Sequence, residues 1–178
     1  VAGFLLANGA LNDSDTLEIR KELIQNDKIE AIVVLPRELF ITTDISVTLW
    51  ILNPNKKGGK YHGRNLRNRE HEILFMDLRQ WTENAVKGES KKKVRLNTEQ
   101  IEKAADIYHT WQCEETDGAA YEIPELYRGV CINEIESKGW ALTPSKYIEF
   151  IDHDLDIDYE KEMARIQSEM KDILKQEK

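Results

Sequence analysis

The sequence predicts an α/β fold with a mixed, open sheet, and three observations support this fold class. Residues 1–8 and 29–35 are continuous apolar runs of strand length, as expected for strands covered on both faces. Residues 15–26, between them, repeat apolar side chains at helical spacing and can form the crossover that parallel strands require. The strand pattern at 46–53 follows a link too short for a second crossover helix, so we expect this strand to run antiparallel to its neighbours.

Composition limits the function classes. The chain of 178 residues is 40% hydrophobic and 33% charged, which is enough for a globular domain with a core. Its formal net charge of −8 excludes binding to nucleic acid by bulk electrostatics, so any DNA contact must come from a local patch or a partner. No apolar run approaches the roughly 20 residues that cross a bilayer, and no signal peptide is visible. We therefore expect a cytoplasmic protein without membrane association.

Cysteine usage agrees with that compartment. Cys113 and Cys131 stand alone, form no CxxC pair and have no histidine at zinc-ligand spacing, which predicts two free thiols and no metal site. The chain opens at Val1 directly on a strand pattern and not on methionine, and we expect that further chain precedes it.

The first helix has a start signal and a buried face. Asp15 followed by Glu18 resembles a capping box, which predicts that the helix begins there. Leu23 and Ile24, together with the stem of Arg20, recur at helical spacing and predict the face that packs on the sheet.

Beyond the third strand the pattern becomes irregular. Residues 54–70 contain three glycines and six cations and predict a basic loop. Residues 72–78 form a fourth strand pattern, and residues 79–97 a polar connector. Residues 97–112 begin with Asn-Thr and then repeat apolar side chains at helical spacing, which predicts an amphipathic helix.

The remaining chain is mixed and then helical. Residues 113–150 contain one short strand pattern at 128–133 and an extended segment around Pro144. Residues 158–177 predict a helix with a coiled-coil-like seam, formed by Tyr159, Met163, Ile166, Met170 and Ile173. We expect three regions: an α/β unit at 1–82, a mixed helical and irregular extension at 83–157, and the coiled-coil-like helix at 158–178.

Common enzyme signatures are absent from the sequence. It holds no GxGxxG, GxxxxGK[ST], HExxH or GxSxG motif. Its four histidines are scattered, and we expect them at the surface or in packing roles. Its four tryptophans are expected to be packing anchors.

An ordered set of segments carries a family resemblance. The segments are VAGFLLANGAL, IRKELIQNDKIEAIVVLPRELF, TTDISVTLWIL and ILFMDLR, followed later by LTPSKYI. Their order resembles the second half of the modification subunits of type I restriction–modification systems, which are adenine-N6 DNA methyltransferases with a Rossmann-like core. The resemblance covers most of residues 1–82 and, more weakly, residues 126–150. It implies that the α/β unit is the distal half of a methyltransferase sheet with one antiparallel strand, followed by a mostly helical C-terminal region.

Individual positions match the family pattern or depart from it. The matching positions are Asn8, Gly9 and Leu11 in the turn after the fifth sheet strand, Ile19, Arg20, Lys21 and Leu23 in the helix, Leu35, Pro36, Leu39 and Phe40 in the tip after the sixth strand, and Thr43 and Ile45 before the next strand. The departures are Ala7 where proline is common, Asp44 in place of the usual glycine, and Val47 in place of a common threonine.

The resemblance also implies what the chain lacks. In this family S-adenosylmethionine binds at a glycine-rich turn after the first strand, and an N-P-P-[FY] motif after the fourth strand holds the target amino group. Neither motif occurs here, because the one Asn-Pro pair, Asn53-Pro54, is followed by asparagine and lies after the wrong strand. The resemblance therefore implies a C-terminal fragment of a methyltransferase that is active when full-length. Alone, the fragment is expected to be inactive and to hold no catalytic residue.

Three sets of residues are candidates for function. The resemblance places Phe40 where related enzymes stack an aromatic ring on the flipped target base, although Phe40 could instead pack the tip against the sheet. The basic loop, with Lys56, Lys57, Lys60 and Arg64, is expected near the DNA-facing edge and could contact phosphates or be merely solvated. The C-terminal seam is expected to bind the specificity subunit, as in family members, unless it packs on its own domain.

The implied partners are DNA and the specificity and restriction subunits of the same system. Two other interpretations stay open. The chain could be a non-catalytic interaction module that docks the specificity subunit through residues 158–177, or an unrelated α/β domain. The family sheet makes one further prediction: the strands at 1–8, 46–53 and 29–35 lie side by side in that order, the middle one antiparallel, with the edge of the strand at 1–8 exposed.

Overall fold

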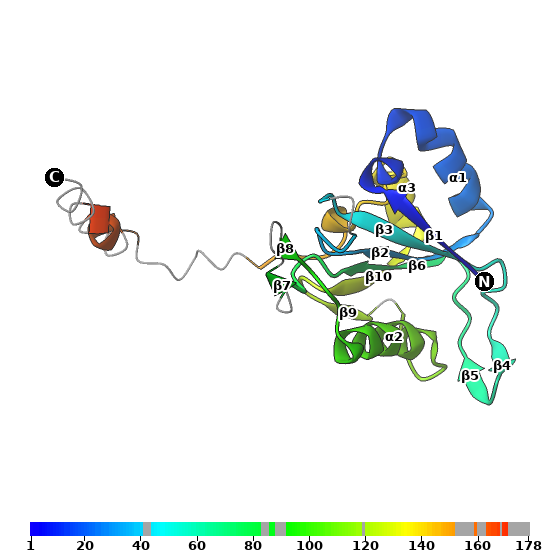
Figure 1. Ribbon diagram of the computed structural model, residues 1–178. Helices are drawn as coiled ribbons and strands as arrows, with labels where there is room; N and C mark the ends of the chain where they lie inside the picture. Colours follow the sequence, from blue (N-terminus) through cyan, green and yellow to red (C-terminus); the bar gives the residue numbers. More distant parts are fainter. Residues whose placement is uncertain are drawn as a thin grey trace.

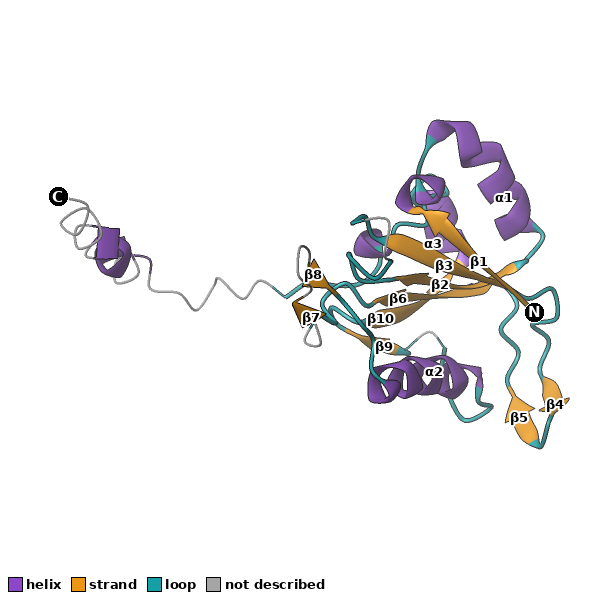
Figure 2. Ribbon diagram, viewed as in Figure 1, coloured by secondary structure: helices purple, strands orange, loops and turns teal. Residues whose placement is uncertain are grey.

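A mixed six-stranded sheet lies at the centre of the fold, in a computed structural model that describes residues 1–40, 44–82, 86–87, 92–118, 120–151, 159, 163–167 and 169–170. The strand order is β1-β3-β2-β6-β10-β9. Helices α1 (Leu17–Gln25) and α3 (Ile132–Ser137) cover one face of the sheet, and α2 (Thr98–Gln112) covers the other (Figure 1, Figure 2). The predicted α/β fold class is confirmed.

The first four sheet strands have the predicted arrangement. Strand β3 (Val47–Leu52) lies between β1 (Ala2–Ala7) and β2 (Ile29–Val34) and is antiparallel to both. Strand β2 pairs in parallel with β6 (Glu72–Asp77) on its other side. The predicted order of the strands at 1–8, 46–53 and 29–35 is therefore confirmed, as is the reversed direction of the middle strand.

Two later strands extend the same sheet. Strand β10 (Tyr127–Cys131) pairs antiparallel with β6, and the short β9 (Glu122–Ile123) pairs antiparallel with β10. The strand pattern at 128–133 thus forms a strand that ends earlier than predicted, because Ile132 already begins α3. Residues assigned to the C-terminal extension consequently share a sheet with residues 1–82.

The parallel strands give the sheet two distinct ends. Since β1, β2 and β6 run in one direction, Ala7, Val34 and Asp77 lie together at what we call the carboxyl end. Strand β3 runs in the opposite direction, so Leu52 lies at the other end, called here the amino end, opposite Ala2 and Ile29. This geometry decides which loops can share a surface.

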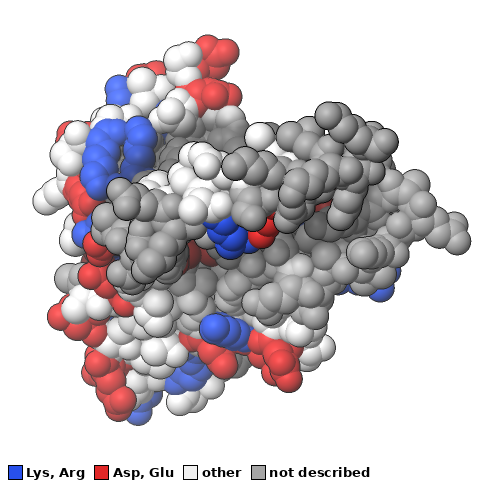
Figure 3. Space-filling model, turned by 90° about the vertical axis from the view of Figure 1, so that its left-hand side faces the viewer, with Lys and Arg blue, Asp and Glu red and all other residues white. Residues whose placement is uncertain are grey.

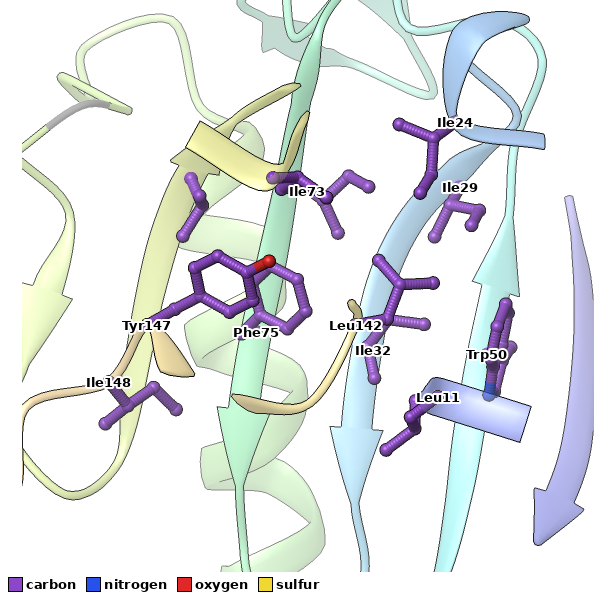
Figure 4. Packing of buried hydrophobic residues seen from close by; sticks show 12 residues of the cluster. Leu11, Ile24, Ile29, Ile32, Trp50, Ile73, Phe75, Leu142, Tyr147 and Ile148 are labelled. Atoms are coloured by element: carbon purple, nitrogen blue, oxygen red, sulfur yellow. The ribbon is translucent and has the colours of Figure 1, made fainter. Parts of the chain in front are cut away.

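Strand β2 separates two apolar cores. All six of its residues are buried, as its continuous apolar pattern predicted. Ile32 faces the core beneath α1 and α3, whereas Val33 faces the core beneath α2. In the first core the rings of Phe75 and Tyr147 stack with centroids 4.5 Å apart (Figure 4). Burial of such apolar surface is the main stabilising contribution to the fold.

Strand β1 is an exposed apolar edge. Each of its six residues is exposed, including Phe4, Leu5 and Leu6. The strand pairs with β3 on one side only and lies at the edge of the sheet. The predicted exposed edge is confirmed, whereas the prediction that this strand is covered on both faces is wrong for the described part of the chain. The backbone groups on the open edge can pair with a further strand.

The two main helices begin differently from one another. Helix α2 is confirmed and starts with a capping box, in which Asn97 and Gln100 exchange side-chain to backbone hydrogen bonds of 2.8 and 3.0 Å. The capping box predicted from Asp15 and Glu18 is wrong. Residues Ser14–Thr16 form a 3₁₀ turn, so α1 begins at Leu17 without a side-chain cap.

The predicted loop at 54–70 contains a hairpin that the sequence analysis missed. Strands β4 (Gly59–Tyr61) and β5 (Arg64–Leu66) pair antiparallel. Their connection is the dipeptide His62-Gly63, with φ of 47° and 79°. Positive φ at both central residues is typical of the tight turn whose twist matches a two-stranded hairpin.

The C-terminal seam is described only in part. The backbone is helical at residues 159, 163–167 and 169–170, in agreement with the predicted helix, whereas Ile173 lies outside the described residues. In the connector at 79–97, the two-residue strands β7 (Val86–Lys87) and β8 (Lys92–Lys93) pair. Within the described residues, no helix is long and apolar enough to cross a membrane.

Candidate functional site

The tip between β2 and β3, residues 35–46, lies at the carboxyl end and is fixed at its base. The Leu35 amide donates to the Val47 carbonyl at 2.9 Å, and the Ser46 hydroxyl donates to the Leu35 carbonyl at 2.6 Å. Further out, the Val94 amide donates to the carbonyl of Glu38, whose φ is 61°. The tip is therefore held both by its own strands and by the segment that precedes α2.

Phe40 lies in this tip and is half-buried. Part of its side chain is consequently accessible at the end of the sheet where parallel strands finish, and this is the end at which open α/β sheets bind ligands. Thr43, also singled out from the sequence, lies outside the described residues.

A small cavity opens at the same end of the sheet. Its volume is about 80 Å³. The described residues that line it are Asn8, Leu11, Val34, Arg79, Thr143, Pro144 and Ser145. They come from the ends of β1, β2 and β6 and from the LTPSKYI segment, which the fold brings over the sheet.

Arg79 is held in place by the buried carboxylate of Asp77. Its Nε lies 2.9 and 3.0 Å from the two carboxylate oxygens, and its Nη2 lies 2.5 Å from Oδ2. The hydrogen bond to Asp77 raises the pKa of the guanidinium above its usual value, so it stays charged. Asp77 is 3% exposed, whereas the Arg79 side chain is 44% exposed and keeps contact with solvent.

The side of the molecule at the carboxyl end carries a mixture of acidic and basic side chains among its described residues (Figure 3). Figure 3 shows the side of the molecule on which the carboxyl end lies, and the basic and acidic side chains of the described residues are interspersed there. This distribution agrees with the net charge of −8, which is unsuited to binding polyanions over a broad surface. Among the described residues of this face, a polyanion would therefore contact individual cations and not a broad basic surface (Figure 3).

The basic segment at 54–70 lies at the amino end, where β3 finishes and β6 begins (Figure 1). The reversed direction of β3 carries this segment to the end of the sheet opposite the tip. Phe40 and the cations of this segment therefore do not form one surface.

Lys56 is not a surface cation. Its side chain is 1% exposed, and its ammonium donates to Asp27 Oδ1 at 2.5 Å and to the carbonyls of Ile29 and Glu72 at 3.0 and 2.7 Å. Burial lowers the pKa of Lys56, while Asp27 opposes that shift. We expected a phosphate contact from Lys56, and its burial contradicts that role; its ammonium instead fixes the base of the hairpin.

Glu30 forms the centre of a second buried charge network that the sequence analysis did not identify. Its carboxylate is 0% exposed and accepts hydrogen bonds from Arg69 Nε at 3.0 Å and from Tyr108 Oη at 2.7 Å. Asn53 and Gln112 donate to it as well. The signal in the sequence was a glutamate inside the apolar run IEAIVVL, because a charge there must find partners when it is buried.

The remaining hairpin cations differ in exposure. The Lys57 side chain is 78% exposed, and Lys60 is exposed. Arg64 is half-buried and donates to the His109 carbonyl at 2.8 Å, which ties the hairpin to α2. Lys57 and Lys60 are thus the hairpin lysines that are accessible to a partner.

The described residues of the C-terminal seam are all exposed. The exposed fractions of Tyr159, Met163, Ile166 and Met170 range from 45% to 69%. An apolar stripe of this kind gains stability only when a partner covers it.

The comparisons with known proteins give the family. Residues 1–155 match the family described as N-6 DNA Methylase. The chain belongs to the N-6 DNA methylase family. It is 35% identical over 149 residues to the type I restriction enzyme HindI methylase subunit of Haemophilus influenzae. It is 30% identical over 180 aligned residues to the MjaIX methylase subunit of Methanocaldococcus jannaschii.

This N-6 DNA methylase chain spans only part of those relatives. The two alignments cover 81% and 99% of the chain but 29% of each relative. Among solved structures, the fold resembles the methyltransferase subunit of a type I restriction-modification system from Streptococcus thermophilus, with a TM-score of 0.62 and 20% identity. That match covers 83% of this chain and 26% of the other.

The described residues do not fit a binding site for the methyl donor. A donor site needs a glycine-rich turn between a strand and a helix, where the backbone can approach the ligand. Gly9 is the glycine in the turn that follows β1, and a Cβ there would clash with the Asp13 carboxylate, so its missing side chain makes room for Asp13. Nor do the described residues bring together three metal-ligating side chains.

Proposed function

We propose that this chain is the C-terminal part of the methylase subunit of a type I restriction–modification system. The full-length subunit would transfer a methyl group from S-adenosylmethionine to adenine N6 in DNA, in the cytoplasm. The observation that carries the proposal is the order β1-β3-β2 with a free β1 edge, in a chain that aligns with less than a third of its curated relatives.

The exposed edge of β1 supports the proposal that two parts of one subunit carry different functions. Its apolar side chains and unpaired backbone suit the strand of another sheet half, which would hold the donor and the motif for the target amino group. This chain alone would then be inactive, since the described residues do not fit a donor site. Its own contribution would be to position DNA at the carboxyl end.

Phe40 is the residue that we propose to stack on the flipped adenine. Enzymes that act on a base extrude it from the duplex and hold it against aromatic side chains. Phe40 is half-buried and lies at the carboxyl end, in a tip whose base is anchored at both strands, so part of its side chain is accessible there.

The test is Phe40→Ala in the full-length subunit, assembled with its specificity subunit. Loss of one base–aromatic stack costs roughly 1–3 kcal/mol, so affinity for the target should fall about five- to 150-fold. The fluorescence of 2-aminopurine at the target position should report less stable flipping. Phe40→Trp should retain most of the activity, and Phe150→Ala, at an exposed phenylalanine, serves as the control. Unchanged binding and methylation in Phe40→Ala would show that the ring only packs the tip.

The second candidate function is a protein-interaction module that docks the specificity subunit. The exposed seam of Tyr159, Met163, Ile166 and Met170 favours it. Met163→Glu should weaken co-purification of the specificity subunit at least tenfold, whereas Ala164→Glu, at an exposed helical position outside the seam, should not. If a subunit truncated at residue 155 still retains its partner, the seam is not the docking surface. The restriction subunit would join the same complex.

We also propose phosphate contacts for the accessible hairpin cations Lys57 and Lys60, with Arg64 beside them. Because the hairpin lies at the amino end, these contacts would be made to duplex remote from the target adenine.

A further inference from the structure

We propose that the cavity at the carboxyl end binds one phosphodiester of the DNA strand that carries the flipped adenine, with Arg79 as the charged ligand. The inference rests on the proposed function and adds a contact to it: Phe40 holds the base, and the cavity holds the backbone beside it. An enzyme that rotates a nucleotide out of the duplex about its backbone must hold that backbone on the protein.

The chemistry of the cavity favours an anion. Arg79 provides a guanidinium whose charge is shared with the buried Asp77 carboxylate and whose side chain is 44% exposed. Asn8, Thr143 and Ser145 provide an amide and two hydroxyls that can donate hydrogen bonds. These are the side chains that commonly contact DNA phosphates. No aspartate or glutamate is among the described residues that line the cavity, although the chain has 33 acidic residues against 25 lysines and arginines.

The donors are available for a ligand. Arg79 uses Nε and Nη2 on Asp77, and Nη1 has no hydrogen bond with the described residues. The side chains of Asn8, Thr143 and Ser145 likewise make no hydrogen bond in the described part of the chain. A volume of about 80 Å³ exceeds several times the roughly 10–15 Å³ that a cavity needs to hold one water, so the cavity can admit a small anionic group.

The cavity wall is held rigidly. The Leu142 amide donates to the Leu11 carbonyl at 2.8 Å, which joins the LTPSKYI segment to the turn after β1. The ring of Tyr147 stacks on Phe75, and its hydroxyl donates to the Ala141 carbonyl at 2.5 Å. The contacts with both carboxylate oxygens of Asp77 fix the guanidinium of Arg79. Donors that are already in position lose little entropy when they bind an anion.

The experiment uses the full-length methylase subunit in complex with its specificity subunit and compares wild type with Arg79→Gln. A lost phosphate contact should weaken binding about tenfold for cognate and unrelated DNA alike. It should also reduce the slope of log affinity against log salt by about one. Lys28→Gln, which removes an exposed charge at the amino end, is the matched control and should leave that slope unchanged.

A scan with neutral methylphosphonates identifies the phosphate. In wild type, one position beside the target adenine should lose affinity when it is neutralised, and Arg79→Gln should abolish the loss at that position alone. Ser145→Asp leaves the Arg79–Asp77 pair intact and places a carboxylate at the cavity, so it should also weaken DNA binding. This second variant keeps the test valid if Arg79→Gln does not fold.

The possible failures are distinguishable. The inference would be overturned if wild type and both variants had the same slope of log affinity against log salt and lost affinity at the same methylphosphonate positions. The proposed function would remain intact. A loss of S-adenosylmethionine affinity with DNA binding unchanged would also overturn it, because the cavity would then hold the donor's carboxylate. If the wild-type complex transfers no methyl group to DNA, the proposed function itself fails.

Discussion

The two ends of the sheet differ in how far their charged side chains are buried. At the amino end, Glu30, Lys56 and Arg69 are at most 1% exposed, and each is paired with an opposite charge. At the carboxyl end, Asp77 is buried but its partner Arg79 is 44% exposed beside a cavity. A buried network whose charged groups are all paired has no hydrogen-bonding group left for a ligand. A partly exposed cation such as Arg79 still has donors that a ligand can reach. We therefore assign a structural role to the buried charges of the amino end and a role in recognition to Arg79 at the carboxyl end.

The hairpin illustrates the structural role. Its base is held by Lys56 on Asp27 and by Arg69 on Glu30, and the Arg69 amide also donates to the Lys56 carbonyl at 2.9 Å. Arg67 adds a pair with Glu72 and lies over the ring of Trp111. A two-stranded hairpin is marginal in isolation, so these contacts at its base account for its order.

The largest predicted effect comes from breaking the buried pair at the amino end. Arg69→Met leaves the Glu30 carboxylate buried without its counter-ion, which should lower the free energy of unfolding by about 3–5 kcal/mol. Arg79→Met is the matched substitution at the carboxyl end. It should cost less, about 1–3 kcal/mol, because loss of the 44% exposed Arg79 side chain opens Asp77 to water and the backbone amide of residue 79 still donates to this carboxylate. Urea denaturation of both variants measures the difference, and equal losses would refute the contrast between the two ends.

A smaller effect is expected at high pH. Burial, followed by the charge of Glu30, raises the pKa of Tyr108. The folded state then retains a proton that the unfolded state loses above pH of about 10, so stability should fall as pH rises beyond that value. Tyr108→Phe should cost about 1.5–3 kcal/mol at pH 7 through the lost hydrogen bond to the Glu30 carboxylate, and the difference from wild type should shrink at alkaline pH.

Tyr147 provides the comparison for this titration. Burial also raises its pKa, but Tyr147 donates to a backbone carbonyl and does not contact Glu30. Tyr147→Phe should, like Tyr108→Phe, reduce the loss of stability with rising pH above about 10. If neither substitution changes how steeply the free energy of unfolding falls with pH, the buried tyrosines are not the cause of that fall. Urea midpoints measured at pH 7 and at pH of about 10.5 decide the matter.

The sequence by itself determined the main elements and their directions. The apolar run of β2, the helical spacing of α2 and the short link before β3 are local signals, because periodicity and chain length restrict which structures can form. The tip with Phe40 was also placed correctly after a buried strand. The order of the first three strands followed from the family resemblance and is confirmed.

Tertiary structure decided which charged residues are available. Lys56 and Lys57 are adjacent and chemically identical, yet one is buried on Asp27 and the other is exposed, since only the folded chain brings Asp27 to the first. The cavity at the carboxyl end likewise joins Asn8, Arg79 and Ser145 from segments distant in sequence. Burial and proximity between distant segments are set by packing, and no local pattern of residues encodes them.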